Sequence, residues 1–215
     1  GNLQKILFPD AIQNITLDNQ VNLEVVGIPY VDEQATAKNL ATFSISNCNA
    51  IKSLRYPLSD NGEENLTFGP LKYVQYLTVN NSLNQMTGMN FEGFEKLRTV
   101  DITNMPFIEN IDFINLLPAE AVSTFEKITL ANIPKVDKVS FNVTSDDYKI
   151  AFVNGATIDM GALNIKTLES NTGIQGAKKL ILPVGLQELK FTTDYGNYAG
   201  DIENIWSFSA IHTND

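Results

Sequence analysis

The chain of 215 residues has only one Cys, one His and one Trp. A disulfide needs two cysteines and a structural zinc site needs several Cys or His ligands, so both are excluded. A catalytic triad would depend on His212, three residues from the C-terminus, where chain ends are usually frayed. The sequence also has no Gly-rich phosphate loop, GxSxG elbow or metal-binding His pair. We therefore expect a protein that is not an enzyme and has no metal and no cofactor.

Basic residues are also in short supply. Fifteen Lys and Arg face 25 Asp and Glu, which gives a formal net charge of −10. This charge argues against nucleic acid and anionic membrane surfaces as partners, because both are bound through clustered cations. No apolar run approaches the roughly 18 residues of a membrane-spanning helix. With 43% hydrophobic residues, the chain is expected to fold as a single domain over residues 1–215 around one sizeable core.

Asparagine is abundant and marks an internal repeat. Apolar residues stand seven, four and two positions before the Asn, and four and seven positions after it, at Asn19, Asn47, Asn104 and Asn132. Asn81 and Asn154 satisfy the same template in part. The six anchors are separated by 28, 34, 23, 28 and 22 residues. Repeats of this length are typical of solenoid proteins.

The spacing within each unit predicts its conformation. Apolar and polar residues alternate before the anchor, as in the segments 15–18 and 100–103, which is typical of a short strand with one buried face. Strands of successive units would stack at about 4.8 Å in a parallel sheet. The segment that carries the later apolar pair would run back along the opposite side of the solenoid and close each unit around a common core. By alternation the Asn itself is expected on the inner side, where its amide would satisfy backbone groups.

The pattern Leu40-x-x-Phe43-x-Ile45-x-x-Cys48 resembles the leucine-rich repeat. The recurrent Asn stands one residue before the Asn/Cys position of the consensus, where Cys48 stands and is expected to be buried. The resemblance implies an α/β leucine-rich-repeat solenoid, a right-handed β-α superhelix. It would be β-dominated, with a parallel concave sheet and short convex segments. The repeats would cover about residues 10–195, and residues 196–215 would form a C-terminal cap.

A late segment, residues 180–189, is similar to the Leu-x-Leu-Pro-x-x-Leu-x-x-Leu variant of BspA-like bacterial surface repeats. Short helices are predicted at 90–97 and 113–125, where Glu and Ala cluster. A polar surface loop is predicted at 59–65. The aromatic residues that are expected to cover the last unit are Tyr195, Tyr198, Trp206 and Phe208.

The outward row of the parallel sheet is the usual binding surface of leucine-rich repeats, and the template assigns its residues. The predicted binding residues are Tyr76, Thr78, Thr99, Asp101, Lys127 and Thr129. The same template places Lys149 and Ala151 in the unit of Asn154. A structural interpretation stays open, because Thr is simply favoured on exposed strands. The functional interpretation rests on Tyr76 as an interface anchor beside charged neighbours.

Neighbouring carboxylates at 63–64 and 146–147 are interpreted as solvated charge, and 60–63 lacks the ligand spacing of a calcium loop. The resemblance implies a non-enzymatic recognition module that binds a protein or glycan through its concave sheet. It implies an extracellular or bacterial cell-surface location, with a signal peptide removed ahead of Gly1. We expect a monomer. The alternative is a structural spacer or scaffold that carries another domain.

Overall fold

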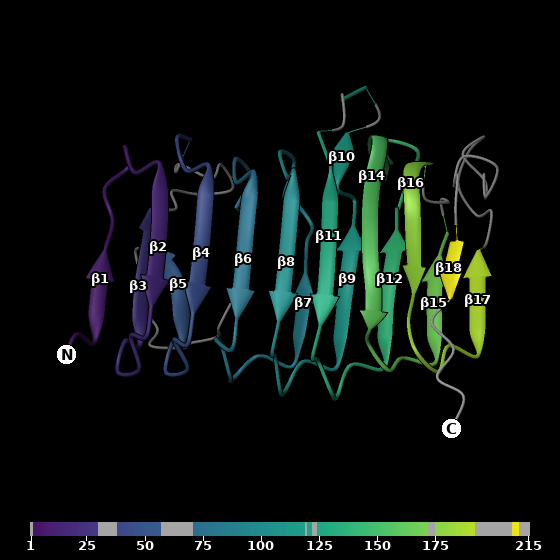
Figure 1. Ribbon diagram of the computed structural model, residues 1–215. Coiled ribbons are helices and arrows are strands. Elements are labelled where there is room, and N and C mark those ends of the chain that lie inside the picture. The colour runs from purple at the N-terminus through teal and green to yellow at the C-terminus, as the bar shows by residue number, and fades with distance from the viewer. Residues whose placement is uncertain are drawn as a thin grey trace.

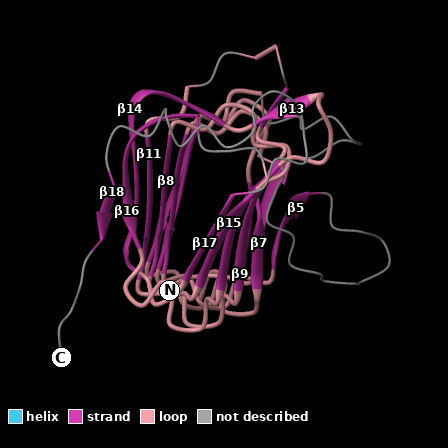
Figure 2. Ribbon diagram, turned by 90° about the vertical axis from the view of Figure 1, so that its right-hand side faces the viewer, coloured by secondary structure: helices cyan, strands magenta, loops and turns pink. Residues whose placement is uncertain are grey.

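The computed structural model describes residues 2–29, 38–56, 71–118, 120–121, 124–171, 175–191 and 208–210. These ranges contain strands and turns and no helix. The strands stand side by side along the molecule and form two layers (Figure 1). The end-on view shows the layers facing one another, with turns joining them at both ends (Figure 2).

One layer is a single eight-stranded sheet in which every pairing is parallel. Its strands follow one another in chain order. They are β2 (Asn14–Asp18), β4 (Thr42–Ser46), β6 (Tyr76–Asn80), β8 (Thr99–Thr103), β11 (Lys127–Ala131), β14 (Ala151–Ala162), β16 (Gln175–Leu182) and β18 (Phe208–Ala210). The predicted parallel sheet is therefore confirmed.

The opposite layer is also built from parallel strands. A three-stranded sheet contains β1 (Lys5–Leu7), β3 (Val25–Pro29) and β5 (Ser53–Tyr56), and a five-stranded sheet contains β7 (Gly88–Asn90), β9 (Asn110–Ile114), β12 (Lys138–Asn142), β15 (Thr167–Ser170) and β17 (Glu188–Phe191). From β2 onward the chain alternates between the layers. We call one strand of the eight-stranded sheet, the following turn and one strand of the opposite layer a unit. A small antiparallel pair, β10 (Leu117–Pro118) with β13 (Tyr148–Lys149), lies outside this alternation.

The α component of the predicted class and the two predicted helices are wrong for the described residues. Segment 90–97 is the end of β7 followed by turns, and Gly93 has φ 80°, which interrupts a right-handed helix. Phe113, at the start of the second predicted helix, lies in β9 and pairs with Phe141 of β12. The backbone groups of this segment bond to neighbouring strands, and that tertiary pairing overrides the local helix propensity of Glu and Ala.

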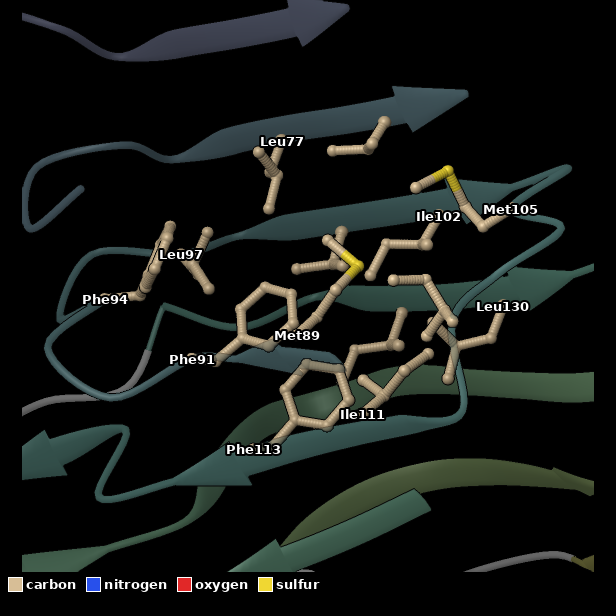
Figure 3. Packing of buried hydrophobic residues seen from close by; sticks show 14 of the residues in the cluster. Leu77, Met89, Phe91, Phe94, Leu97, Ile102, Met105, Ile111, Phe113 and Leu130 are labelled. Carbon is tan, nitrogen blue, oxygen red and sulfur yellow. The ribbon is translucent and has the colours of Figure 1, made fainter. Parts of the chain in front are cut away.

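The core lies between the layers and follows the repeat template. All five template positions of the units of Asn47, Asn104 and Asn132 are buried. In the unit of Asn19, Ile12 and Leu17 are partly buried. Figure 3 shows Leu77, Ile102 and Leu130 of the eight-stranded sheet packing toward Met89 and Ile111 of the opposite layer. The apolar part of the template is therefore confirmed, and it supplies one core.

The anchor asparagines stand at the corners of the units and not inside them. Asn19, Asn47, Asn81, Asn104 and Asn132 all have positive φ, between 44° and 56°. Asn is among the few residues that adopt this left-handed conformation readily. The backbone N–H groups of the first four anchors donate to a carbonyl of the next unit, as Asn104 does to Ala131 at 3.1 Å. The predicted inner position is wrong, because the left-handed residue turns the chain and breaks the strand alternation.

The residue after the anchor is the one that enters the core. Cys48, Ser82, Met105 and Ile133 occupy this position and are at most 2% exposed. The expectation that Cys48 is a core residue is confirmed. Its backbone N–H donates to Ser82 Oγ at 3.0 Å, and its thiol lies 3.2 Å from the carbonyl of Ser46. Burial raises the pKa of the Cys48 thiol above its ordinary value.

The unit predicted around Asn154 has a different register. Asn154 lies within β14, and the residues of β14 that pair with β11 are Thr157, Ile158, Asp159 and Ala162. Lys149 belongs to β13 and Ala151 begins β14 and pairs with Gln175. The template failed here because β14 is 12 residues long, so that Asn154 lies inside the strand and not at the corner that follows it.

The predicted cap is only partly described. Phe208 begins β18, which pairs with β16 at the edge of the eight-stranded sheet. Tyr195, Tyr198, Trp206 and His212 lie outside the described residues, as does the predicted loop 59–65.

Candidate binding face

The six predicted binding residues lie together on the outward face of the eight-stranded sheet. Three of them, Tyr76, Thr99 and Lys127, are direct cross-strand neighbours on β6, β8 and β11. Thr78, Asp101 and Thr129 form a second row two residues further along the same strands. We call these six residues the two-row face. The structure therefore confirms their predicted proximity, and their binding role stays a prediction.

The outward direction of these side chains follows from the strand alternation. Leu77, Val100 and Ile128 stand between the two rows on the same strands, and each is at most 1% exposed. Tyr76, Asp101 and Lys127 are exposed, and the Thr residues are half-buried by their neighbours. The inward residues anchor each strand to the core. Within each row, neighbouring residues are about 4.8 Å apart, which is the spacing of hydrogen-bonded strands.

Tyr76 is held by two residues that the sequence analysis did not identify. The guanidinium carbon of Arg98 lies 5.9 Å from the centroid of the Tyr76 ring. Arg98 in turn donates from Nε to Glu126 Oε1 at 3.0 Å, and its terminal nitrogen contacts the same oxygen. This hydrogen bond with Glu126 raises the pKa of Arg98, so the side chain stays charged. A cation above an aromatic ring is attracted by the ring's negative face.

Arg98 and Glu126 each precede the first residue of an outward strand. They are 28 residues apart, which is the spacing of the anchors Asn104 and Asn132. Opposite charges at equivalent positions of successive units are placed side by side by the register of β8 and β11. The sequence therefore indicates this pairing, because both residues stand directly before the predicted outward residues Thr99 and Lys127.

The charged residues of the two-row face differ in their ion pairing from those of the opposite layer. On the five-stranded sheet Lys138 forms an ion pair with Glu169, 2.6 Å from Nζ to Oε1, and Ser140 donates to Asp112. Among the described residues, Asp101 and Lys127 belong to no ion pair. Their carboxylate and ammonium groups are consequently available for an external partner.

The described residues contain no group of three or more His, Cys, Asp or Glu side chains that could hold a metal ion. None of the described segments is a helix of the length and apolarity that a membrane span requires. Comparison with protein-family models, with curated proteins and with solved structures finds no match to this chain.

Proposed function

We propose that this chain is a non-enzymatic recognition module, built as a solenoid of the leucine-rich-repeat type, and that it binds a protein through the two-row face. The solenoid interpretation is supported by the regular alternation of the chain between two facing parallel layers. It is also supported by the common corner geometry of the five Asn residues with positive φ. In this chain the segments of the opposite layer are strands, at the positions where the leucine-rich-repeat resemblance implies short helical segments.

The observation that carries the proposal is the braced position of Tyr76. Tyr76 is 40% exposed on the outward face of the sheet, where its aromatic ring is accessible to a partner. The Arg98 and Glu126 pair restricts its freedom before a partner arrives, which lowers the entropy lost on binding. Tyr and Arg are the residues most enriched at energetically dominant positions of protein interfaces.

The proposal includes a location outside the cell or on a bacterial surface. Its support is the similarity of residues 180–189 to BspA-like surface repeats. The structure places Leu180 in the core and a turn at 183–187, which joins β16 to β17 as a repeat unit would.

A binding experiment with matched variants tests the two-row face. The wild-type chain, a Tyr76→Ala/Asp101→Ala variant and a Thr167→Ala/Glu188→Ala control would be immobilised and exposed to solubilised host-cell surface proteins. Thr167 and Glu188 are cross-strand neighbours on the opposite layer, so the control removes two side chains from the other face. A captured protein would then be purified and its dissociation constant measured by surface plasmon resonance.

We expect the Tyr76→Ala/Asp101→Ala variant to weaken binding by at least roughly tenfold, which corresponds to about 1.4 kcal/mol. The control variant should bind as the wild type does, and all three chains should unfold at the same temperature. Equal affinity of the two variants, or loss of stability in the Tyr76→Ala/Asp101→Ala variant, would show that the two-row face is not the binding surface.

A further inference from the structure

A second surface lies at the corner where β8, β11 and β14 end. An open depression of about 460 Å³ is lined there mainly by amide and proline side chains. Its principal lining residues are Asn81, Asn104, Asn132 and Asn164, with Pro106 and Pro134. We call it the asparagine groove. It belongs to the turns that follow the strands, so it is separate from the two-row face.

The groove opens where the regular ladder of strands is interrupted. Thr129 pairs with Asp159, but two residues later Ala131 pairs with Ala162, so β14 contains one extra residue over this stretch. Such a bulge bends its strand, so residues at matching positions of β11 and β14 are no longer direct neighbours beyond it. On the side of β14 the groove is lined by Ala162, which has a small side chain, and by Asn164.

Hydrogen bonds between side-chain amides hold Asn132 and Asn104 in place. Asn132 Nδ2 donates to Asn104 Oδ1 at 3.0 Å, and Asn104 Nδ2 donates to Asn80 Oδ1 at 2.7 Å. Each amide has two donor hydrogens and an oxygen with two lone pairs, so one internal bond leaves further donor and acceptor capacity. Asn104 and Asn132 are exposed, and they present this capacity in a row along the groove.

The lining carries no charged side chain, although the chain contains 15 basic and 25 acidic residues. A ligand matched to this surface is therefore neutral. Amides that both donate and accept suit hydroxyl groups, while Pro106 and Pro134 offer apolar faces for C–H groups. Phe107 follows Pro106 and is 42% exposed, with Lys135 Nζ 5.0 Å from its ring centroid.

We propose that the asparagine groove binds an extended neutral oligosaccharide. Sugar rings combine hydroxyl edges with apolar C–H faces, which is the alternation that the groove offers. The amides recur from unit to unit at about the strand spacing of 4.8 Å, so a linear chain lying along the corner meets successive amides. Anionic glycans are disfavoured by the absence of basic side chains from the lining and by the net charge of −10.

The test uses the full chain and four named probes: cellohexaose, xylohexaose, β-1,4-mannohexaose and maltohexaose. Each would be titrated to millimolar concentration while the amide signals of the protein are followed by NMR. We expect at least one probe to shift the side-chain amide signals of Asn104, Asn132 and Asn164 in a saturable way. The backbone signals of Thr78 and Thr129 on the two-row face should stay unchanged.

Two variants and a control locate the binding. Asn132→Gly keeps the positive φ, because glycine adopts it freely, and removes one groove amide. Asn19→Gly makes the same change at a corner outside the groove. We expect Asn132→Gly to weaken binding roughly tenfold and Asn19→Gly to leave it unchanged. Pro134→Ala, which removes an exposed apolar face and no hydrogen bond, should also weaken binding.

Three results would overturn this proposal. The first is the absence of shifts with all four probes, and the second is equal binding by Asn132→Gly and Asn19→Gly. The third is a set of shifts on Thr78 and Thr129, which would place the sugar on the two-row face. None of these outcomes depends on the protein partner of the two-row face.

Discussion

Asn132 and Asn104 occupy the same corner of successive units and are joined by a 3.0 Å hydrogen bond between their side-chain amides. Their φ angles are 54° and 56°. Asn81 is joined in the same way to Asn47, at 2.9 Å. One residue type therefore meets two needs at this position: it accepts the left-handed turn and it links neighbouring units.

The left-handed corner predicts an unusual order of substitution effects at Asn104. Asn104→Ala should be destabilising by about 2 kcal/mol, because Ala adds the cost of a left-handed residue to the loss of the amide bonds. Asn104→Gly should cost less, since Gly tolerates positive φ. Urea unfolding of the two variants measures the difference. A Gly variant that is no more stable than the Ala variant would contradict the corner geometry.

The strand alternation predicts a contrast between neighbouring residues. Ile102→Ala and Leu130→Ala remove side chains that are at most 1% exposed, and each should lower the free energy of unfolding by about 2 to 5 kcal/mol. Thr129→Ala and Thr103→Ala lie on the outward side and should cost little, with Thr103 losing only a 3.3 Å contact to Asn80. Equal costs in the two sets, measured by urea unfolding, would mean that the inward and outward faces are assigned wrongly.

An aromatic stack in the opposite wall makes a third prediction. Phe113 lies between Phe91 and Phe141, with ring centroids 4.6 and 4.9 Å away. Phe113→Ala should cost about 3 to 5 kcal/mol, because it leaves a cavity and removes both ring contacts. Phe113→Leu refills much of the space and should cost clearly less. Thermal unfolding followed by circular dichroism compares the two variants. A Phe113→Leu variant that is no more stable than Phe113→Ala would contradict the enclosure of the ring.

Cys48 predicts a dependence of stability on alkaline pH. Burial raises the pKa of the folded thiol above its ordinary value of 9.0, so the thiol of the unfolded chain ionises first as the pH rises. The unfolded state then binds fewer protons than the folded state, and stability falls as the pH rises above 9.0 toward the folded pKa. Urea unfolding at several alkaline pH values measures this fall.

Cys48→Ala is the control, because it should remove the part of the alkaline loss that belongs to the thiol. The same burial predicts that Cys48 reacts slowly with a thiol reagent in the native protein and rapidly in urea. Rapid native reaction would show that the thiol is accessible.

The repeat template predicted the inward residues well because burial depends on a short, local alternation. Phe125, Ile128 and Leu130 precede Asn132 at the template positions, and all three are buried. It did not predict the direction of Asn132 itself, since the sequence pattern assumes that strand alternation continues through the anchor. It also missed β14, where one extra residue shifts the register against β11.

The predicted residues of the two-row face were brought together because equal offsets from the anchors become cross-strand neighbours in a parallel sheet. Arg98 and Glu126 were missed because their interaction depends on side-chain geometry above Tyr76. The asparagine groove depends on the bulge of β14, and the template cannot register an inserted residue within a strand.

The amino-acid sequence alone determined the burial of the apolar template residues, the recurrence of Asn from unit to unit and the absence of the chemistry that needs several Cys or His residues. These properties depend on residue type and local spacing. Only the tertiary structure decided that the return segments are strands, that the Asn amides link units, and that Tyr76 is braced by Arg98. The physical reason is that these features arise from bonds between units 20 to 34 residues apart, such as Asn81 with Asn47 and Ser82 with Cys48.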